Sequence, residues 1–474
     1  MKKKDAETIS IAGATISAAD RSPAESLALV IAWCADEPGR LGEVALFGPR
    51  GKAETLGRGD GEDGEPRVRF FRQRPSRLSP TEPLSGLPLS RRQLTVKPSG
   101  ASLAVERVGR CALLVNGVPT EKAMVSSGDT ILLRGQLLLF CTRRVSSIPK
   151  TVYFLDRSFG AFGEPDGVGI LGEAPEVWQM RERVAFAANA GKHVLLHGES
   201  GTGKELAARA VHGLSARAGK PFVARNAATL PTGLIDAELF GNAKNYPNPG
   251  MAERAGLIGE ADGGTLFLDE IAEIPAEQQA HLLRVLDSDG EYQRLGEATT
   301  RRSDFILVGA TNREPSSLKH DVAARLTLRL ELPPFDARRE DIPLLVRHLL
   351  LLAARKSPQI GERFLQEGTD GRLDARVDPQ LIEGLLGRTY ETHMRELDAI
   401  LWRAMAASPG DTVLYTDDLR QERRVHDAEP NADQLRAALK SAGSVQNAAL
   451  ALGLKSRYAL YRLMKKHGIE VDSE

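Results

Sequence analysis

The 474-residue sequence predicts a multidomain protein: an all-β sandwich, then an α/β domain with a helical lid, then an all-α domain. Short apolar runs separated by turns fill residues 27–144, which is typical of a β-sandwich. Strand-like runs alternate with helical stretches over 173–335, which indicates a parallel sheet. Leucine-rich helical patterns dominate 336–408, and the last segment, 431–474, is helical with a tight glycine turn.

Three further segments are expected to lie outside these domains. Residues 1–26 form a tail, 145–172 a linker, and 409–430 a second linker that is charged and punctuated by Pro and Gly. The longest apolar run, near 348–355, is too short to span a bilayer, and no apolar signal core follows the N-terminus. Three widely spaced cysteines suit a reducing compartment. We therefore expect a cytoplasmic protein with no membrane partner.

The most informative motif is a glycine-rich loop between a predicted strand, 194–196, and a predicted helix, 206–211. Its residues are Gly198, Glu199, Ser200, Gly201, Thr202, Gly203, Lys204 and Glu205. Glycines let the backbone turn its N–H groups toward phosphate oxygens, and the helix adds the positive end of its dipole. Lys204 supplies a mobile charge for the β- and γ-phosphates. The alternative, a glycine turn without a nucleotide, fits less well because the flanking strand and helix are both present.

Polar side chains end two other predicted strands. The apolar run 263–268 ends in Asp269 and Glu270, and the run 305–310 ends in Thr311 and Asn312. ATP chemistry needs one acid for Mg²⁺ and another to polarise water, so we predict Asp269 as the metal partner and Glu270 as the base. The alternative is a solvated loop or a helix cap. Thr311 and Asn312 could sense the γ-phosphate or orient the water, so the predicted cofactors are ATP and Mg²⁺.

With these motifs in place, residues 172–405 resemble the AAA+ domain of sigma-54-dependent transcriptional activators. The glycine loop has Glu205 where generic phosphate loops have Ser or Thr, as this family does. The segment 238–241, Glu-Leu-Phe-Gly, matches the helix before the remodelling loop of the family, and Thr311 with Asn312 matches its first sensor. The resemblance implies an α/β P-loop ATPase with a helical lid and sigma-54 RNA polymerase as a partner.

The resemblance also implies roles for three further residues. Asn226 matches an Asn that responds to the nucleotide state and couples to Glu270. Arg325 matches an arginine finger, which reaches the γ-phosphate of a neighbouring subunit and so implies a homo-oligomer, from a dimer to a ring. Arg395 matches the sensor arginine of the lid. An ordinary surface salt bridge is the alternative for each arginine.

The sequence departs from the pattern of the family at three places. The family signature GAFTGA, which contacts the sigma factor, aligns with 245–250, where this chain has Asn-Tyr-Pro-Asn-Pro-Gly. The Phe and Thr of the signature are absent, and two prolines restrict the backbone. Lys319 replaces an Arg of the finger region, and 389–393 replaces a Trp-Pro-Gly-Asn element. The chain therefore lacks the residues through which the family contacts the sigma factor.

The predicted N-terminal sandwich resembles a forkhead-associated domain, which binds phosphothreonine. Four elements match in order: Gly57-Arg58-Gly59, Leu89-Ser90-Arg91-Arg92-Gln93, Val115-Asn116-Gly117 and Ser127-Gly128-Asp129-Thr130-Ile131. The resemblance implies that Arg58, Ser90 and Arg91 grip a phosphate through charge-assisted and hydroxyl hydrogen bonds. Asn116 would hold the ligand backbone, and Gln93 stands where the family usually has a His. The alternative is a sandwich used only for contacts within the protein.

The C-terminal segment reads as three short helices, 432–440, 445–452 and 456–467, with a glycine turn before the third. A short helix, a turn and a basic helix form a helix-turn-helix arrangement, and this one resembles the Fis-type domain that ends most sigma-54 activators. The apolar positions expected to form its core are Leu435, Leu439, Ala448, Ala449, Leu452, Leu460 and Leu463.

The third helix is the expected DNA-binding element. The formal net charge of the chain is +0, so contact with nucleic acid must come from a local basic patch. Ser456 would cap the helix, and the other expected contacts are Lys455, Arg457, Tyr458, Tyr461, Arg462 and Lys465. A basic helix that is only solvated is the alternative.

Together these features predict a bacterial ATP-dependent transcription regulator that binds promoter or enhancer DNA and is controlled by a phosphothreonine protein. Two alternatives stay open. One is a sigma-54-independent DNA-binding switch in which the nucleotide controls oligomerisation only. The other is a phosphopeptide-binding scaffold with an inert ATPase core.

Overall fold

The structure is a computed structural model, and it divides the chain into two compact units, Met1–Leu414 and Tyr415–Glu474. The residues it describes are 25–49, 51–61, 64–287, 290–368, 371, 373–420 and scattered positions between 435 and 469. The expected tail therefore lies outside the described residues, except for its last two positions, which belong to the first strand.

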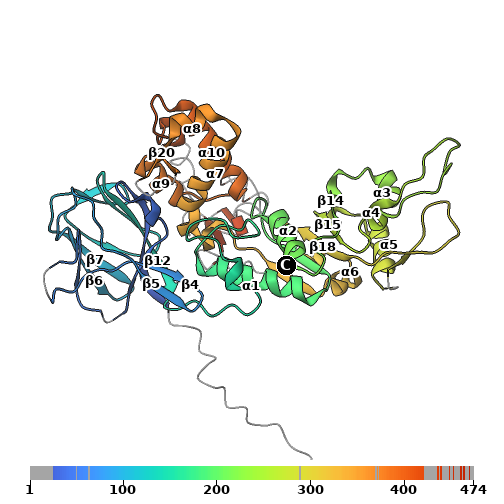
Figure 1. Ribbon diagram of the computed structural model, residues 1–474, viewed down its shortest axis with the longest axis horizontal. Coiled ribbons are helices and arrows are strands. Elements are labelled where there is room, and N and C mark those ends of the chain that lie inside the picture. Colours follow the sequence, from blue (N-terminus) through green and yellow to red (C-terminus); the bar gives the residue numbers. More distant parts are fainter. Residues whose placement is uncertain are drawn as a thin grey trace, which may run out of the picture. The chain divides into compact units, whose positions relative to one another are not determined.

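The N-terminal region is a sandwich of two sheets, as the sequence predicts (Figure 1). The larger sheet has the order β5-β4-β2-β1-β12-β11-β8-β9, and the smaller has the order β10-β7-β6-β3. Leu29 and Ile31 of the larger sheet and Leu94 and Val96 of the smaller share one buried core, because alternate residues of each strand face inward. The strands are β1 (Glu25–Cys34), β2 (Val44–Phe47), β3 (Glu54–Leu56), β4 (Phe71–Arg74), β5 (Arg77–Pro80), β6 (Leu94–Ser99), β7 (Ser102–Arg107), β8 (Leu113–Val115), β9 (Val118–Thr120), β10 (Lys122–Val125), β11 (Thr130–Leu133) and β12 (Leu137–Val145).

The segment 145–172, expected to be a linker, is packed against the helix that follows it. Ile148 and Phe154 share a buried cluster with Trp178 and Ala185 of α1 (Pro175–Ala190). The rings of Phe154 and Trp178 meet edge to face, with centroids 6.4 Å apart. Widely spaced aromatic residues in a Pro- and Gly-rich segment carry no periodic pattern, so the sequence did not show this packing.

The central domain is built on a five-stranded sheet of order β14-β15-β18-β13-β19, and its strands run parallel. Buried apolar clusters lie against this sheet, as expected for an α/β domain. The elements after α1 are β13 (Val194–His197), α2 (Lys204–Leu214), β14 (Phe222–Asn226), α3 (Ile235–Phe240), α4 (Gly256–Glu260), β15 (Thr265–Asp269), α5 (Ala276–Asp287), β16 (Glu291–Tyr292), β17 (Arg301–Arg302), β18 (Ile306–Thr311), α6 (His320–Arg325) and β19 (Leu328–Glu331).

The lid is largely helical, with one addition that the sequence did not predict. Its helices are α7 (Ile342–Lys356), α8 (Pro358–Phe364), α9 (Pro379–Leu386) and α10 (His393–Ala407). A short antiparallel hairpin, β20 (Leu365–Glu367) and β21 (Leu373–Ala375), lies between α8 and α9. Three-residue strands are too short to show an alternating apolar pattern, so the sequence did not predict this hairpin.

Within the first unit, buried charges join the sandwich to the α/β domain. Arg144 of β12 pairs with Glu340 at 3.0 Å and donates to the backbone oxygen of Glu173 at 2.7 Å. Arg74 of β4 pairs with the Glu173 carboxylate at 2.6 Å. Burial raises the pKa of Glu340 to about 7, although Arg144 acts in the opposite direction. The sandwich therefore contacts the ATPase domain through residues that are costly to leave unpaired.

The second unit contains a small apolar core. Among its described residues, the expected core positions 435, 439, 448, 452, 460 and 463 all belong to one cluster, together with Ala438, Met464 and Ile469. Ala449 lies outside the described residues. This cluster agrees with the predicted helical periodicity, while the helix-turn-helix arrangement itself stays a prediction.

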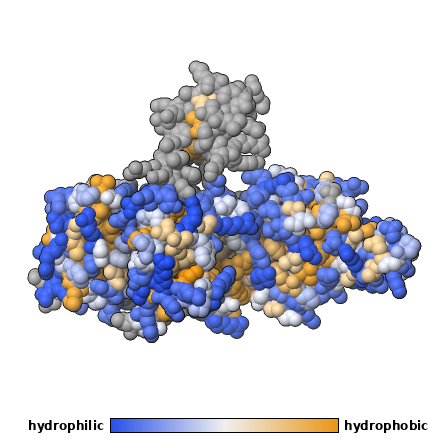
Figure 2. Space-filling view, turned by 90° about the horizontal axis from the view of Figure 1, so that it is seen from above, coloured by the Kyte–Doolittle hydropathy of each residue, from blue (hydrophilic) through white to orange (hydrophobic). Residues whose placement is uncertain are grey.

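One face of the described chain is mostly polar. Figure 2 shows a face on which hydrophilic side chains predominate and apolar side chains lie between them in small groups. In the part of the chain that the structure describes, no helix combines the length and apolar character that crossing a bilayer requires.

Candidate nucleotide-binding site

The glycine-rich loop connects β13 to α2, as the sequence predicts. Lys204 is the first residue of α2 and is 7% exposed. Its Nζ donates to the backbone oxygens of Gly198 at 2.9 Å and Glu199 at 3.1 Å. Burial lowers the pKa of Lys204 below its usual value, while Glu270 and Asp269 act to raise it. The ammonium group is thus held inside the loop, in the electric field of the acid pair.

Thr202 and Glu205, two other polar residues of the loop, bond to parts of the loop and of α2. The hydroxyl of Thr202 donates to the Glu199 backbone oxygen at 2.9 Å and closes the turn. Glu205 is exposed and pairs with Arg209 one helical turn later, at 2.8 Å. Glu205 therefore lies on the solvent side of α2 and does not join the acidic residues of the site.

The acid pair lies at the carboxyl edge of the parallel sheet. Asp269 ends β15, and the backbone of Glu270 has φ +50°, a left-handed conformation that is rare for a residue with a side chain. This turn directs the Glu270 carboxylate to the backbone N–H of Asn312, which donates to it at 3.2 Å. Two neighbouring strand ends are thereby connected, which is where ligands bind in open α/β sheets.

The two remaining sheet-edge candidates are held by local bonds. Asn226 ends β14 opposite Asp269 in register, and its side-chain oxygen accepts from the N–H of Ala228 at 2.9 Å. Thr311 is fully buried, and its hydroxyl oxygen accepts from the N–H of Arg313 at 3.0 Å. At this sheet edge the Glu270 carboxylate accepts from Asn312, whereas the resemblance implies a coupling to Asn226.

The first turn of α10 contacts the glycine loop directly. Arg395 donates to the hydroxyl of Ser200 at 3.0 Å, and the backbone N–H of Met394 donates to Gly201 O at 3.2 Å. A Cβ on Gly201 would lie 2.0 Å from Thr392 O, so a larger residue is excluded by this contact as well as by its φ of +79°. The lid arginine predicted from the sequence therefore lies at the loop.

Arg325 lies elsewhere in the domain. It is the last residue of α6 and pairs with Asp287, the last residue of α5. Its side chain is 54% exposed. The structure thus leaves a large part of this guanidinium accessible, and its predicted role as a finger depends on a second subunit.

The loop that replaces the GAFTGA signature is a compact turn. Asn242 is 3% exposed, and its side-chain amide donates to the backbone oxygens of Ala243 and Ala252, both at 3.0 Å. A Cβ on Gly296 would lie 2.3 Å from the ring of Tyr246, so this ring covers the glycine closely. The turn is therefore held at its base by one buried amide and at its tip by one aromatic ring.

In the sandwich, three of the four predicted phosphopeptide-binding residues, Arg58, Ser90 and Arg91, lie together. The N–H of Arg58 donates to Ser90 O at 3.1 Å, and Arg67 donates to Arg91 O at 2.6 Å and to Arg58 O at 3.0 Å. The hydroxyl oxygen of Ser90 accepts from the N–H of Arg110 at 3.0 Å. Arg67 and Arg110 were not singled out in the sequence, because they lie outside the matching elements.

Gln93 and Asn116 have structural tasks in the sandwich. Gln93 is fully buried, and its side-chain amide bonds both the N–H and the backbone oxygen of Cys111, which ties two loops together. The amide of Asn116 donates to Asp129 at 2.8 Å and accepts from Thr130 N–H at 2.9 Å. The side-chain bonds of Asn116 are therefore to the turn that leads into β11, and its predicted contact with a ligand stays a prediction.

Most of the predicted DNA contacts lie outside the described residues. The exception is Tyr461, which is helical and 46% exposed. The residues outside are Lys455, Ser456, Arg457, Tyr458, Arg462 and Lys465.

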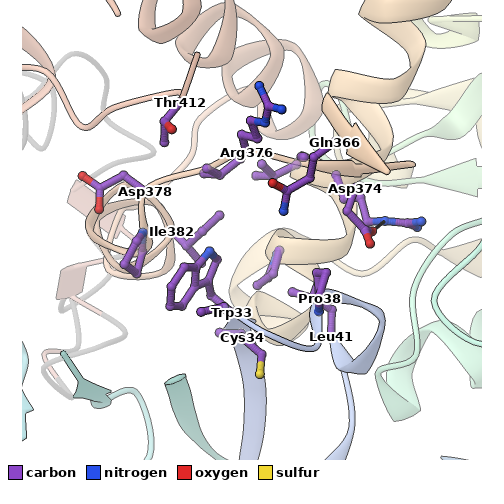
Figure 3. Close-up of a pocket in the computed structure, with 18 of the residues that line it drawn as sticks. Trp33, Cys34, Pro38, Leu41, Gln366, Asp374, Arg376, Asp378, Ile382 and Thr412 are labelled. Carbon is purple, nitrogen blue, oxygen red and sulfur yellow. Dashed lines mark hydrogen bonds and ion pairs between the residues drawn. The ribbon is translucent and has the colours of Figure 1, made fainter. Parts of the chain in front are cut away.

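A cavity of about 650 Å³ lies between the end of β1 and the lid (Figure 3). Trp33 forms part of its wall opposite Gln366 and Arg376 (Figure 3). Arg376 is paired with Asp411 at 2.9 Å. No residue of the glycine loop lines this cavity, so it is separate from the nucleotide site.

Comparison with known proteins agrees with this geometry. Residues 170–334 match the sigma-54 interaction domain, which is an AAA+ ATPase domain. The glycine loop and the acid pair lie inside this match, and the lid arginine lies beyond its end, in α10. The chain is therefore an AAA+ ATPase.

Two curated relatives and one solved structure illustrate the wider similarity. The DNA-binding transcriptional regulator NtrC of Escherichia coli K12 is 34% identical over 336 residues, which cover 64% of this chain and 70% of NtrC. The Nif-specific regulatory protein of Bradyrhizobium diazoefficiens is 37% identical over 256 residues, 52% of this chain and 41% of that protein. A crystal structure of NtrX from Brucella abortus in complex with ATP is 28% identical, with a TM-score of 0.45, and the match covers 66% of this chain and 70% of that one. The chain belongs to the NtrC family of sigma-54-dependent transcriptional regulators.

Proposed function

We propose that this protein couples ATP hydrolysis to the control of transcription at specific DNA sites, as a sigma-54 activator under phosphothreonine control. The observation that carries the proposal is the meeting of three elements at one sheet edge. Lys204 lies within the field of Asp269 and Glu270, and Arg395 of the lid bonds Ser200 of the same loop. An ATPase needs these charges around one triphosphate.

The residues fit ATP and Mg²⁺ by their chemistry. The loop amides and Lys204 would hold the phosphates, and Asp269 would hold Mg²⁺. Mg²⁺ takes much of its coordination from phosphate and water, so one carboxylate such as that of Asp269 suffices on the protein side. When bound, Mg²⁺ neutralises charge on the phosphates.

Glu270 is the proposed base for the attacking water. Its left-handed backbone and its bond from Asn312 N–H orient the carboxylate along the sheet edge. Thr311 and Asn226 hold the ends of the neighbouring strands in place through their local bonds. Arg325 would leave Asp287 to reach the γ-phosphate of an adjacent subunit, which makes hydrolysis depend on assembly.

The C-terminal unit is the proposed DNA-binding element. Its described apolar positions share one cluster, and Tyr461 is exposed on a helix, which supports the proposal. Dimers would place two such units on a palindromic site. DNA binding would also concentrate subunits and so favour the ring.

Transcription with purified sigma-54 polymerase tests this function directly. We expect open complexes at the cognate promoter only when this protein and ATP are both present, because remodelling needs hydrolysis. A variant that lacks 431–474 should require a much higher protein concentration, since it loses the contribution of the DNA site. Open complexes that form equally well without ATP would contradict the proposal.

The compact turn at 242–254 favours one rival function. Asn242 holds the base of this turn by hydrogen bonds, and Tyr246, which stands within the segment that replaces the signature, packs on Gly296. A protein with this turn could bind DNA and change its oligomeric state with the nucleotide, without remodelling polymerase. ATP-dependent assembly on DNA combined with no open complexes in the same assay would support this switch.

The arginine cluster of the sandwich is the proposed phosphothreonine site. Arg58→Ala should weaken binding of a degenerate phosphothreonine peptide library by about 10- to 100-fold, the value of one charge-assisted hydrogen bond. Arg134→Ala removes an exposed arginine outside the cluster and serves as the matched control. Fluorescence anisotropy measures both. Equal binding of phosphorylated and unphosphorylated peptides by the natural protein would contradict this site.

A further inference from the structure

One buried side chain at the nucleotide site has no assigned task. His393 is the first residue of α10, is 1% exposed, and has φ +43°. It lies in the segment where the sequence departs from the family pattern. A left-handed backbone costs free energy for a residue with a side chain, so the contacts around His393 must stabilise this conformation.

The contacts of the imidazole join two parts of the site. Its Nε2 lies 3.1 Å from a carboxylate oxygen of Glu199 in the glycine loop. A carboxylate accepts, so Nε2 carries the hydrogen of this bond. Its Nδ1 is buried with no hydrogen-bond partner. The ring therefore makes one hydrogen bond, from Nε2 to the glycine loop, and its buried Nδ1 makes none.

One buried phenylalanine packs against the imidazole ring of His393. Phe335 is fully buried, and its ring centroid lies 5.2 Å from that of His393. Phe335 also lies under the guanidinium of Arg338, which donates to Thr202 O at 3.4 Å. The residues that support His393 are thus themselves connected to the same loop.

The neighbours of His393 also contact the glycine loop. Thr392 covers Gly201, Met394 bonds Gly201, and Arg395 bonds Ser200. The bond to Glu199 extends this contact by one loop residue toward β13. Four successive lid residues therefore meet three successive loop residues.

We infer that His393 is a positioning residue for ATP binding: through Glu199 it fixes the glycine loop against the first turn of α10. The loop amides then point at the phosphates before ATP arrives, and Arg395 stands over Ser200. Pre-organisation of this kind strengthens binding because less freedom is lost when the ligand enters. The inference rests on the proposed nucleotide site and adds to it a residue that touches no reacting atom.

The test uses His393→Asn in the full-length protein. Asn tolerates a left-handed backbone, but its amide is too short to reach the place of Nε2, so the variant removes the bond and keeps the turn. We expect the KM for ATP to rise about tenfold, with kcat changed less than about threefold, since one partly exposed charge-assisted bond is lost. A role in folding alone would lower the active fraction and leave KM unchanged.

Two partner variants complete the test. His393→Gln carries an amide nitrogen at about the reach of Nε2 and should restore most of the lost affinity. Glu199→Ala should raise KM as His393→Asn does, and the double variant should be no worse than either single one. Natural KM in His393→Asn, or additive effects in the double variant, would overturn the inference. No ATP turnover by the natural protein would instead overturn the nucleotide site itself.

Discussion

Replacement of Lys204 by Ala is expected to abolish ATP turnover, with a loss of at least about 100-fold in kcat/KM, because the phosphates lose their nearest charge. Lys204 is 7% exposed and bonds two carbonyl oxygens of its own loop. Circular dichroism of the variant checks that the fold is kept. Phosphate release measures the turnover, and binding of a fluorescent ATP analogue measures the affinity for the nucleotide.

Lys192→Ala is the matched control for this experiment. Lys192 lies a short distance upstream on the same chain and is exposed. It should leave turnover and nucleotide binding within about twofold of the natural values, as surface substitutions usually do. Turnover that survives in Lys204→Ala, with the control also active, would remove Lys204 from the site.

Replacement of Glu270 by Gln is expected to separate hydrolysis from binding. The amide keeps the shape of the side chain and its place near Asn312 N–H, but it cannot take a proton from water. We expect kcat to fall by about 10²- to 10⁴-fold, the usual contribution of a general base, with ATP affinity nearly unchanged. Single-turnover hydrolysis and equilibrium binding of labelled ATP measure these quantities.

Glu277→Gln provides the control for a lost carboxylate. Glu277 is exposed in the first turn of α5 and carries the same charge change. Its kcat should stay near the natural value. If Glu270→Gln loses affinity and turnover in equal measure, its carboxylate acts in binding and the proposed base must be another residue.

Much of the site could be predicted from the sequence because its elements are local. A glycine loop between a strand and a helix, and two acids at a strand end, are contiguous patterns. Parallel strands place their carboxyl ends at one edge, and the structure bonds Glu270 to the backbone N–H of Asn312 there, a contact that the sequence did not predict. The AAA+ ATPase class and the β-rich N-terminal region followed from the same kind of evidence.

Contacts between distant segments could not be predicted in this way. The packing of 145–172, the pairing of Arg325 with Asp287, and the bond from Thr130 to Glu383 of the lid join residues that no short pattern relates. The bonds of the Asn116 amide to Asp129 and Thr130 were not predicted either, and its predicted contact with a ligand stays a prediction.

The sequence by itself determined the order of the β-rich and α/β regions, the glycine loop and the acid pair, because backbone geometry and apolar periodicity are properties of neighbouring residues. Only the tertiary structure decided which lid residues meet the loop. Thr392, His393 and Arg395 contact the loop only because the whole lid folds over it. The sequence at the start of α10 does not indicate that this segment meets the glycine loop. Contacts between segments that are far apart in the sequence depend on how the helices and strands pack together, which no single segment determines.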